Sequence, residues 1–119
     1  MTEFVVIRTP SFDSLLTDAR SEHPAVEHDI AWLIGRLAAA PEAMGNRVTD
    51  LSQLALPIFK TRCKDSCHTL GSAAGWRIYY AVSKEARKVF LLFIHHKKDY
   101  ELPRQAFLLQ KLERALPEF

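Results

Sequence analysis

The stretch at residues 75–100, GWRIYYAVSKEARKVFLLFIHHKKDY, predicts a β-hairpin. Its first half alternates with the period of a half-buried strand, which places Arg77 and Tyr79 together on one side. Its second half, residues 89–94, is apolar on both faces and rich in β-formers, as in a central strand covered on both sides. The short polar link at residues 84–87 joins the two strands.

The second strand of this hairpin ends in a run of cations and proton carriers. The run reads HHKKDY and contains His95, His96, Lys97, Lys98 and Tyr100. Histidine exchanges protons near neutral pH, and lysine binds phosphate as a compact positive charge. This run is the part of the sequence that points most directly to a function.

Length and composition predict one globular domain over residues 1–119. The chain contains 48% hydrophobic and 25% charged residues, which is usual for such a domain. It contains no apolar run near the roughly 20 residues of a membrane helix. The N-terminal MTEFVVIRT lacks the features of a secretory signal, and two cysteines are too few for a disulfide scaffold. These features predict a cytoplasmic protein with no membrane partner.

The net charge of +2 hides an asymmetry between the two halves of the chain. Residues 1–50 have a net charge of −4, whereas residues 51–119, which include the hairpin, have a net charge of +6. A basic surface favours a polyanionic partner, because lysine and arginine neutralise phosphates and release counterions. A solvated basic face that binds nothing explains the charge equally well.

The rest of the chain predicts helices before and after the strands. Apolar residues at i, i+3, i+4 and i+7 indicate a first helix from an N-cap at Ser11 to Arg20, and Pro24 opens a second helix that ends at Ala40. The other expected segments are a strand at residues 4–8, a turn at 41–45, a connector at 46–56, a strand from Pro57, a loop at 65–74 and a final helix with Pro103 near its first turn.

In this order the segments predict an α+β fold, β-α-α-β-β-β-α, with one curved, mainly antiparallel sheet of four strands packed by helices. The first two helices are expected on one face of the sheet and the last helix beside it. The expected core comprises Phe12, Leu16, Ile30, Leu33, Leu37, Ile78, Leu92 and Ile94.

A strand rich in cations precedes the hairpin. Lys60, Arg62 and Lys64 recur at every second position, so they project from one face of this strand. Three like charges on one face repel one another, which favours a face that meets an anion. An edge strand that lysines protect against aggregation is the alternative.

A group of metal-ligand types, Cys63, Cys67 and His68, resembles a fragment of a zinc site. Its spacing fits no common zinc finger, and no second pair of ligands follows. The sequence therefore predicts neither a metal nor a cofactor.

The ordered series of these segments resembles the RelE/ParE toxin superfamily, and within it the RelE- and HigB-like mRNA endonucleases. The basic strand IFKTRCK, the loop into GWRIYY, the apolar strand VFLLFIHHKK and the terminal helix carry this resemblance. It implies a RelE-like fold and the toxin of a type II toxin–antitoxin pair. Such a toxin cleaves mRNA on the ribosome, inhibits translation and is held inactive by a cognate protein antitoxin in a hetero-oligomer.

On the first two strands of this series, the resemblance implies an RNA-binding face. Lys60, Arg62 and Lys64 match the basic strand that faces RNA in RelE-like toxins. Arg77 matches the arginine of the glycine-aromatic-arginine strand, and we expect it to bind the scissile phosphate bidentately.

At the end of the hairpin the sequence departs from the pattern of many relatives. Either Lys97 or Lys98 matches the basic residue at the end of the last strand, and Tyr100 matches a tyrosine that some members have just beyond it. Where many relatives have a tyrosine two positions before that lysine, this chain has His95.

Cleavage of RNA by its own 2′-hydroxyl without a metal needs a base, cations around the phosphorane and an acid for the leaving 5′-oxygen. Like charge nearby favours the neutral form of a lysine, so Lys60 or Lys64 is the candidate base. The candidate acid is His95, His96 or Tyr100. For either histidine, a structural role at the end of a strand is the alternative.

Tyr79 shares its face with Arg77, where it is placed to stack on an unpaired base. A tyrosine in the core or at its rim is the alternative. The expected catalytic residues are Lys60, Arg62, Arg77, His95, Lys97 and Tyr100, and the expected RNA-binding residues are Lys64, Tyr79, His96 and Lys98.

Two other functions are compatible with the same pattern, because one fold hosts several activities. ParE-like members of the superfamily bind and inhibit DNA gyrase and catalyse nothing. A catalytically degenerate member that only binds its antitoxin is the third option. The cations on one face favour the nuclease, since a gyrase inhibitor needs no convergent cationic pocket.

Overall fold

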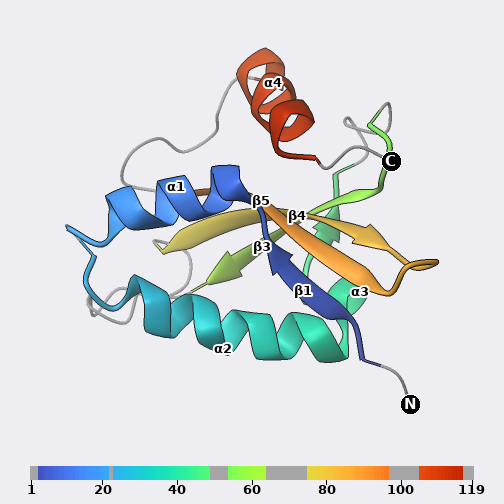
Figure 1. Ribbon diagram of the computed structural model, residues 1–119, viewed down its shortest axis with the longest axis horizontal. Helices are drawn as coiled ribbons and strands as arrows, with labels where there is room; N and C mark the ends of the chain where they lie inside the picture. Colours follow the sequence, from blue (N-terminus) through green and yellow to red (C-terminus); the bar gives the residue numbers. More distant parts are fainter. Residues whose placement is uncertain (1–2, 22, 49–53, 64–74, 97–104, 117–119) are drawn as a thin grey trace.

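The computed structural model describes residues 3–21, 23–48, 54–63, 75–96 and 105–116 (Figure 1). These residues form a mixed α+β domain with four helices and one five-stranded sheet. In chain order the elements are β1 (Val5–Arg8), α1 (Pro10–Ala19), α2 (Val26–Ala39), α3 (Pro41–Met44), β2 (Asn46–Arg47), β3 (Ile58–Cys63), β4 (Trp76–Ser83), β5 (Lys88–His96) and α4 (Gln105–Ala115). No helix in these ranges combines the length and the apolarity that crossing a bilayer requires.

The sheet has the strand order β1-β5-β4-β3-β2. β1 pairs with β5 in parallel, and the three other pairings are antiparallel. The expected hairpin is β4 and β5, joined by the link at residues 84–87. β5 lies inside the sheet between β1 and β4, which confirms the central strand that the apolar residues 89–94 predict.

The expected count of four strands is one too low. Asn46–Arg47 forms β2, which pairs with Lys60 and Phe59 of β3, in a segment that the sequence predicts as a connector. Both residues of β2 are exposed, so no apolar alternation marks this strand in the sequence. The expected turn at residues 41–45 is also wrong. Pro41–Met44 forms α3, a single helical turn that begins at Pro41.

The start of α1 differs from the expected one. Thr9, and not Ser11, is the N-cap, and its hydroxyl accepts a hydrogen bond from the backbone nitrogen of Phe12 at 3.3 Å. The same hydroxyl donates to the carbonyl oxygen of Leu91 in β5 at 2.7 Å. Thr9 therefore fixes the turn from β1 into α1 against the central strand, and Pro10 follows it as the first helical residue.

Two apolar clusters hold the helices against opposite faces of the sheet. α2 covers one face and α4 covers the other, as Figure 1 shows with α2 below the sheet and α4 above it. α1 lies along β5 and contributes Phe12 and Leu16 to the face that α2 covers. All eight residues of the expected core are buried. The first cluster contains Phe12, Leu16, Val26, Ile30, Leu33, Leu37, Phe59, Cys63, Trp76, Ile78, Tyr80, Val82, Val89, Leu91 and Ile94. The second contains Ile58, Tyr79, Ala81, Phe90, Leu92, Phe93, Leu112 and Ala115.

A β-bulge in β5 changes which residues face each cluster. Tyr79 pairs with Phe93 and Tyr80 pairs with Leu91, so Leu92 has no opposite residue on β4. The alternation of β5 shifts by one position at Leu92. As a result, Phe93 is on the same face as Leu92 and Phe90, which is the face that α4 covers.

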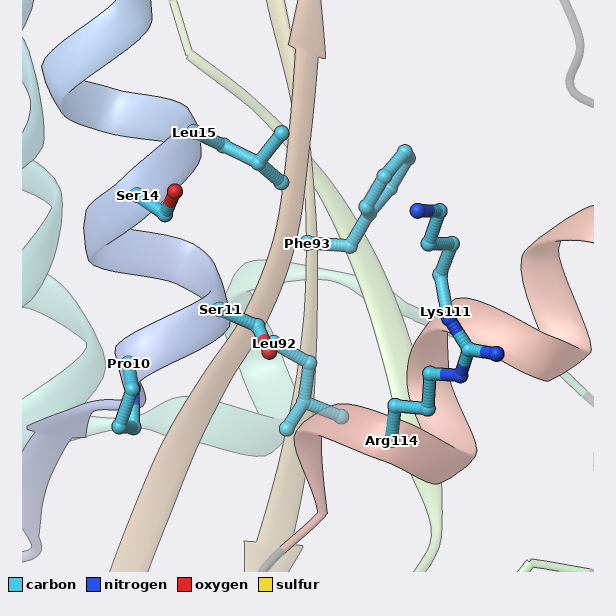
Figure 2. A pocket seen from close by; sticks show the side chains of 8 residues that line it. All are labelled: Pro10, Ser11, Ser14, Leu15, Leu92, Phe93, Lys111 and Arg114. Atoms are coloured by element: carbon cyan, nitrogen blue, oxygen red, sulfur yellow. The ribbon is translucent and has the colours of Figure 1, made fainter.

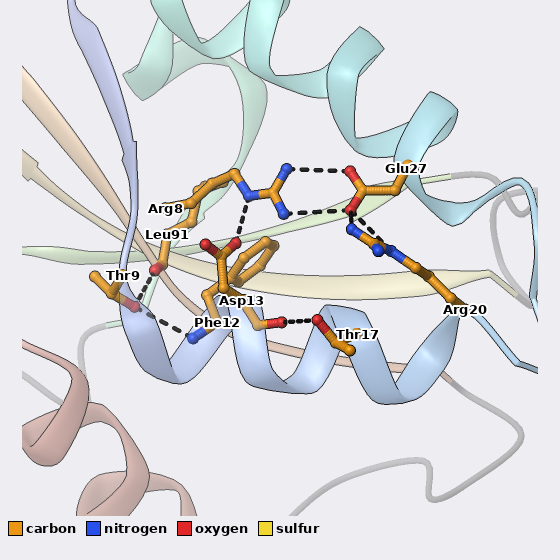
Figure 3. Close-up of polar contacts among 8 residues, drawn as sticks. All are labelled: Arg8, Thr9, Phe12, Asp13, Thr17, Arg20, Glu27 and Leu91. Atoms are coloured by element: carbon orange, nitrogen blue, oxygen red, sulfur yellow. Dashed lines mark hydrogen bonds and ion pairs between the residues drawn. The ribbon is translucent and has the colours of Figure 1, made fainter.

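An ion-pair network joins β1, α1 and α2 at one edge of the domain (Figure 3). The guanidinium of Arg8 donates to Glu27 through two nitrogens, at 3.1 and 3.3 Å, and also donates to Asp13. Arg20 donates to the same Glu27 carboxylate. The hydrogen bonds from Arg8 and then from Arg20 hold the pKa of Glu27 below its ordinary value of 4.5.

Candidate functional site

Three basic side-chain positions form one row across β3, β4 and β5. Arg62 pairs with Arg77, and Arg77 pairs with His95, so all three are on the same face of the sheet. We call this row the basic row. Opposite residues of an antiparallel pair lie about 5 Å apart, so the row spans about 10 Å between its outer Cα atoms.

The neighbouring row on the same face is aromatic at its centre. Lys60 pairs with Tyr79, and Tyr79 pairs with Phe93. The rings of Tyr79 and His95 lie nearly parallel with centroids 6.2 Å apart, and the ring of Phe93 lies 5.8 Å from that of His95. In the two rows together, the lysine and arginines are on β3 and β4, and the aromatic rings are on β4 and β5.

Burial divides the two rows into an outer and an inner part. The side chain of Arg62 is exposed and that of Lys60 is half-buried. Arg77, Tyr79 and His95 have exposed fractions of only 8%, 3% and 4%. A molecule that approaches the sheet therefore meets Arg62 and Lys60 before it meets the inner three residues.

Arg77 has an unusual environment for an arginine. Its Nη1 donates long hydrogen bonds to the carbonyl oxygens of Trp76 at 3.3 Å and Gly75 at 3.5 Å. Burial lowers the pKa of its guanidinium, and the positive charge of Arg62 lowers it further, while Tyr79 opposes both effects. An anion beside Arg77 would offset the unfavourable burial of its charge, because it favours the charged form.

The two histidines at the end of β5 lie on opposite faces of the sheet. His95 belongs to the basic row, whereas His96 pairs with Trp76 on the face that α2 covers. The imidazole of His96 is 1% exposed and stacks on that of His23 with centroids 4.5 Å apart. Trp76 meets both rings edge-on at 4.8 Å.

This arrangement favours a structural role for His96 over the expected binding of RNA. A ring enclosed between Trp76 and His23 is part of the packing between β5 and the turn that joins α1 to α2. The burial of His96 therefore favours its structural alternative, and Trp76 packs in the first cluster against the helices, as its alternation predicts.

The other expected site residues, Lys64, Lys97, Lys98 and Tyr100, lie outside the described residues, as do Cys67 and His68. Cys63 is buried in the first cluster, where its thiol donates to the carbonyl oxygen of Asp29 at 3.5 Å. In the ranges that the structure describes, no three histidine, cysteine or carboxylate side chains are close enough to hold a metal ion.

The chain matches no protein-family model and no curated protein. The resemblance to the RelE/ParE superfamily therefore rests on the order of the segments and on the residues of the strands.

Sequence reasoning missed two further cations near this site. Lys111 and Arg114 of α4 border a pocket that Phe93 also lines. Their spacing of three residues on one helix was the available signal, because it places both side chains on the same face.

Proposed function

We propose that this protein is a RelE-like toxin of a type II toxin–antitoxin system, and that it cleaves mRNA on the ribosome without a metal. The observation that supports this proposal is the basic row, in which Arg62, Arg77 and His95 lie side by side with Lys60 in the next row. A row of this kind combines cations for a phosphate with a group that exchanges protons near neutral pH.

In the proposed reaction the 2′-oxygen of one nucleotide attacks the adjacent phosphorus. The bond from phosphorus to the 5′-oxygen of the next nucleotide then breaks. The products are a 2′,3′-cyclic phosphate and a free 5′-hydroxyl. Lys60 takes the proton of the 2′-hydroxyl, and His95 donates a proton to the leaving 5′-oxygen.

Arg77 stabilises the charge that develops on the phosphorane in this proposal. Its hydrogen bonds to the backbone oxygens of Gly75 and Trp76 are long, and a phosphate oxygen is a stronger acceptor for a guanidinium than a neutral carbonyl. Arg62, which is exposed, binds the RNA strand first and brings its phosphate toward Arg77. The ring of Tyr79 is 3% exposed and belongs to the second cluster, so in this proposal it stacks on an unpaired base only after it becomes exposed.

The proposed partner that silences the toxin is a cognate antitoxin, an acidic or amphipathic protein. A toxin half with a net charge of +6 attracts such a protein over a long range. Coexpression of this antitoxin is expected to restore growth.

One observation favours a second candidate function, that of a binding module without catalysis. Arg77, Tyr79 and His95 are almost fully buried, and a group that acts on RNA must reach it. A ParE-like gyrase inhibitor and a degenerate toxin both belong to this class.

Induction of the chain in bacteria separates these functions. The endonuclease produces new mRNA 5′ ends within translated codons, whereas a gyrase inhibitor produces DNA damage and no such ends. A binding module produces neither. New 5′ ends that vanish in Arg77→Ala support the proposal, and DNA damage without them overturns it.

A further inference from the structure

A pocket of about 440 Å³ lies on the opposite face of the sheet from the basic row. Its lining includes Phe59 of β3 and Val82 of β4, which belong to the first cluster, whereas the pocket between α1, β5 and α4 is on the face of the second cluster (Figure 2). A volume of this size is typical of small-molecule sites. The lining residues are Glu42, Arg47, Ala55, Leu56, Pro57, Phe59, Val82, Ser83, Lys84 and Glu85.

The sheet brings apolar and charged residues together in this lining. Arg47 of β2 pairs with Phe59, and Phe59 pairs with Tyr80, so the Arg47 side chain is on the face of the first cluster. The apolar lining comes from residues 55–59 and Val82, and the charged lining comes from α3, β2 and the hairpin link. A ligand in the pocket therefore meets apolar and charged groups together.

Two of the four charges in the lining neutralise each other. Lys84 of the hairpin link forms an ion pair with Glu42 of α3 at 3.3 Å. Arg47 and Glu85 are both exposed, and within the described ranges neither side chain has an ion pair or a hydrogen bond. One cation and one anion of the lining are therefore left for a ligand.

The opposite signs of these two charges select the class of ligand. An anion would bind Arg47 but would also meet the carboxylate of Glu85, and a cation would bind Glu85 but would also meet Arg47. A zwitterion satisfies both, because its carboxylate binds a guanidinium and its ammonium binds a carboxylate. Leu56 and Pro57, which are half-buried, offer apolar surface for the rest of such a ligand.

We propose that this pocket binds a small zwitterion with an apolar side chain, either a free amino acid or a dipeptide. Arg47 binds its carboxylate, Glu85 binds its ammonium, and its side chain packs on Leu56 and Pro57. The two ligands differ in the distance between their charges, because each residue of an extended chain adds about 3.3–3.6 Å. This proposal goes beyond the proposed function and does not depend on it, since the pocket and the basic row are on different faces of the sheet.

Titration of the ¹⁵N-labelled protein, followed by NMR, tests the proposal with leucine and leucylleucine as probes. The better of the two is expected to bind with a dissociation constant on the order of 1 mM, because the ligand is small and its charged contacts are exposed. Saturable shifts should appear at the backbone amides of Phe59 and Val82, and not at that of Leu112 in α4. The comparison of the two probes shows which distance between the charges fits the pocket.

Blocked forms of the better probe test each charge separately. N-acetylation removes the ammonium and amidation removes the carboxylate, and each is expected to weaken binding about fivefold, the usual upper limit for one exposed ion pair. Glu85→Gln should weaken binding of the zwitterion by a similar factor, but it should not weaken binding of the N-acetylated form. Arg47→Gln should likewise weaken binding of the zwitterion and not that of the amidated form.

Two control variants remove the same charges from exposed positions outside the pocket. Arg36→Gln on α2 and Glu113→Gln on α4 should leave all affinities unchanged. Affinities that depend on the ligand charges and on Arg47 and Glu85 in the expected pattern support the proposal. Equal affinities for the zwitterionic and blocked forms, or no saturable shift at the lining residues, overturn it.

Discussion

Arg77 of β4 and His95 of β5 are directly opposite each other in the sheet, and Arg62 continues their row on β3. The β-bulge at Leu92 produces this pairing, because it shifts the alternation of β5 by one residue. A guanidinium and an imidazole are thereby placed on one face, both almost fully buried.

Replacement of Arg77 by alanine is expected to lower mRNA cleavage by on the order of 100-fold or more, because it removes a charge that stabilises the transition state. Arg77→Lys should restore only part of the rate, since lysine cannot bind phosphate bidentately. Single-turnover cleavage of ribosome-bound mRNA measures both effects. Arg36→Ala, on the exposed side of α2, is the control, and full activity in Arg77→Ala would show that the site is wrong.

Replacement of the two adjacent histidines by glutamine should have different results. His95→Gln is expected to lower the rate by on the order of 100-fold and to remove the pH dependence near neutrality, because it removes the proton donor. His96→Gln should keep the pH profile and lower the free energy of unfolding by about 1–3 kcal/mol, because it disturbs buried stacking with His23. The pH–rate profile and urea denaturation of each variant distinguish the two roles. Loss of the pH dependence in His96→Gln but not in His95→Gln would contradict the placement of His95 in the basic row and of His96 in the core.

Any side chain at position 45 is expected to destabilise the protein. A Cβ at this position would lie 2.6 Å from the backbone oxygen of Lys60 and 2.7 Å from the hydroxyl of Tyr80. Gly45→Ala should therefore lower the free energy of unfolding by about 1–3 kcal/mol in urea denaturation. Gly35→Ala is the matched control, because outside the neighbouring residues and backbone of α2 itself nothing lies within 4 Å of its Cβ position, which is exposed. This control should raise stability by about 0.5–1 kcal/mol, and a similar gain at Gly45 would refute the close contact.

Thr9→Ala is expected to destabilise the protein by about 1–2 kcal/mol, because it removes the cap of α1 and the hydroxyl that donates to Leu91. Thr17→Ala removes a hydroxyl that donates to a backbone oxygen on the exposed side of the same helix. Its effect should stay within about 0.5 kcal/mol. Thermal unfolding of both variants, monitored by circular dichroism, provides the comparison, and equal effects would count against the dual role of Thr9.

Stability is expected to depend on pH through Glu27. Its pKa is lower in the folded protein than in the unfolded chain, so its ion pairs stabilise the fold above about pH 4.5 and this contribution is lost as the pH falls through the folded pKa. Glu27→Gln should cost at most about 1 kcal/mol at pH 7, because the pair is partly exposed. The difference between Glu27→Gln and the parent should shrink toward pH 3 in urea denaturation. Glu85→Gln, in the exposed hairpin turn, should show no such trend.

Much of the fold follows from local patterns of residues. The alternation around Arg77 and the apolar run at residues 89–94 predicted the hairpin and its central strand, and both are confirmed. Helical periodicity predicted the first two helices, which are present as α1 and α2. The expected final helix is present as α4, where Leu112 and Ala115 pack in the second cluster. β2 and α3 escaped prediction because they are too short to have a period of their own.

The candidate site was only partly predictable. The sequence placed Lys60 and Arg62 on one face of a strand and Arg77 beside Tyr79, because side chains alternate strictly along a regular strand. It did not show which of the two histidines joins them, since that depends on the register between β4 and β5.

The sequence by itself therefore determined the longer helices and strands and the cations on the two strands before β5, because these depend on local periodicity. Only the tertiary structure decided that His95 faces Arg77 and that His96 packs between Trp76 and His23. The physical reason is the bulge at Leu92, which exchanges the faces of all later residues of β5 and arises from pairing between strands.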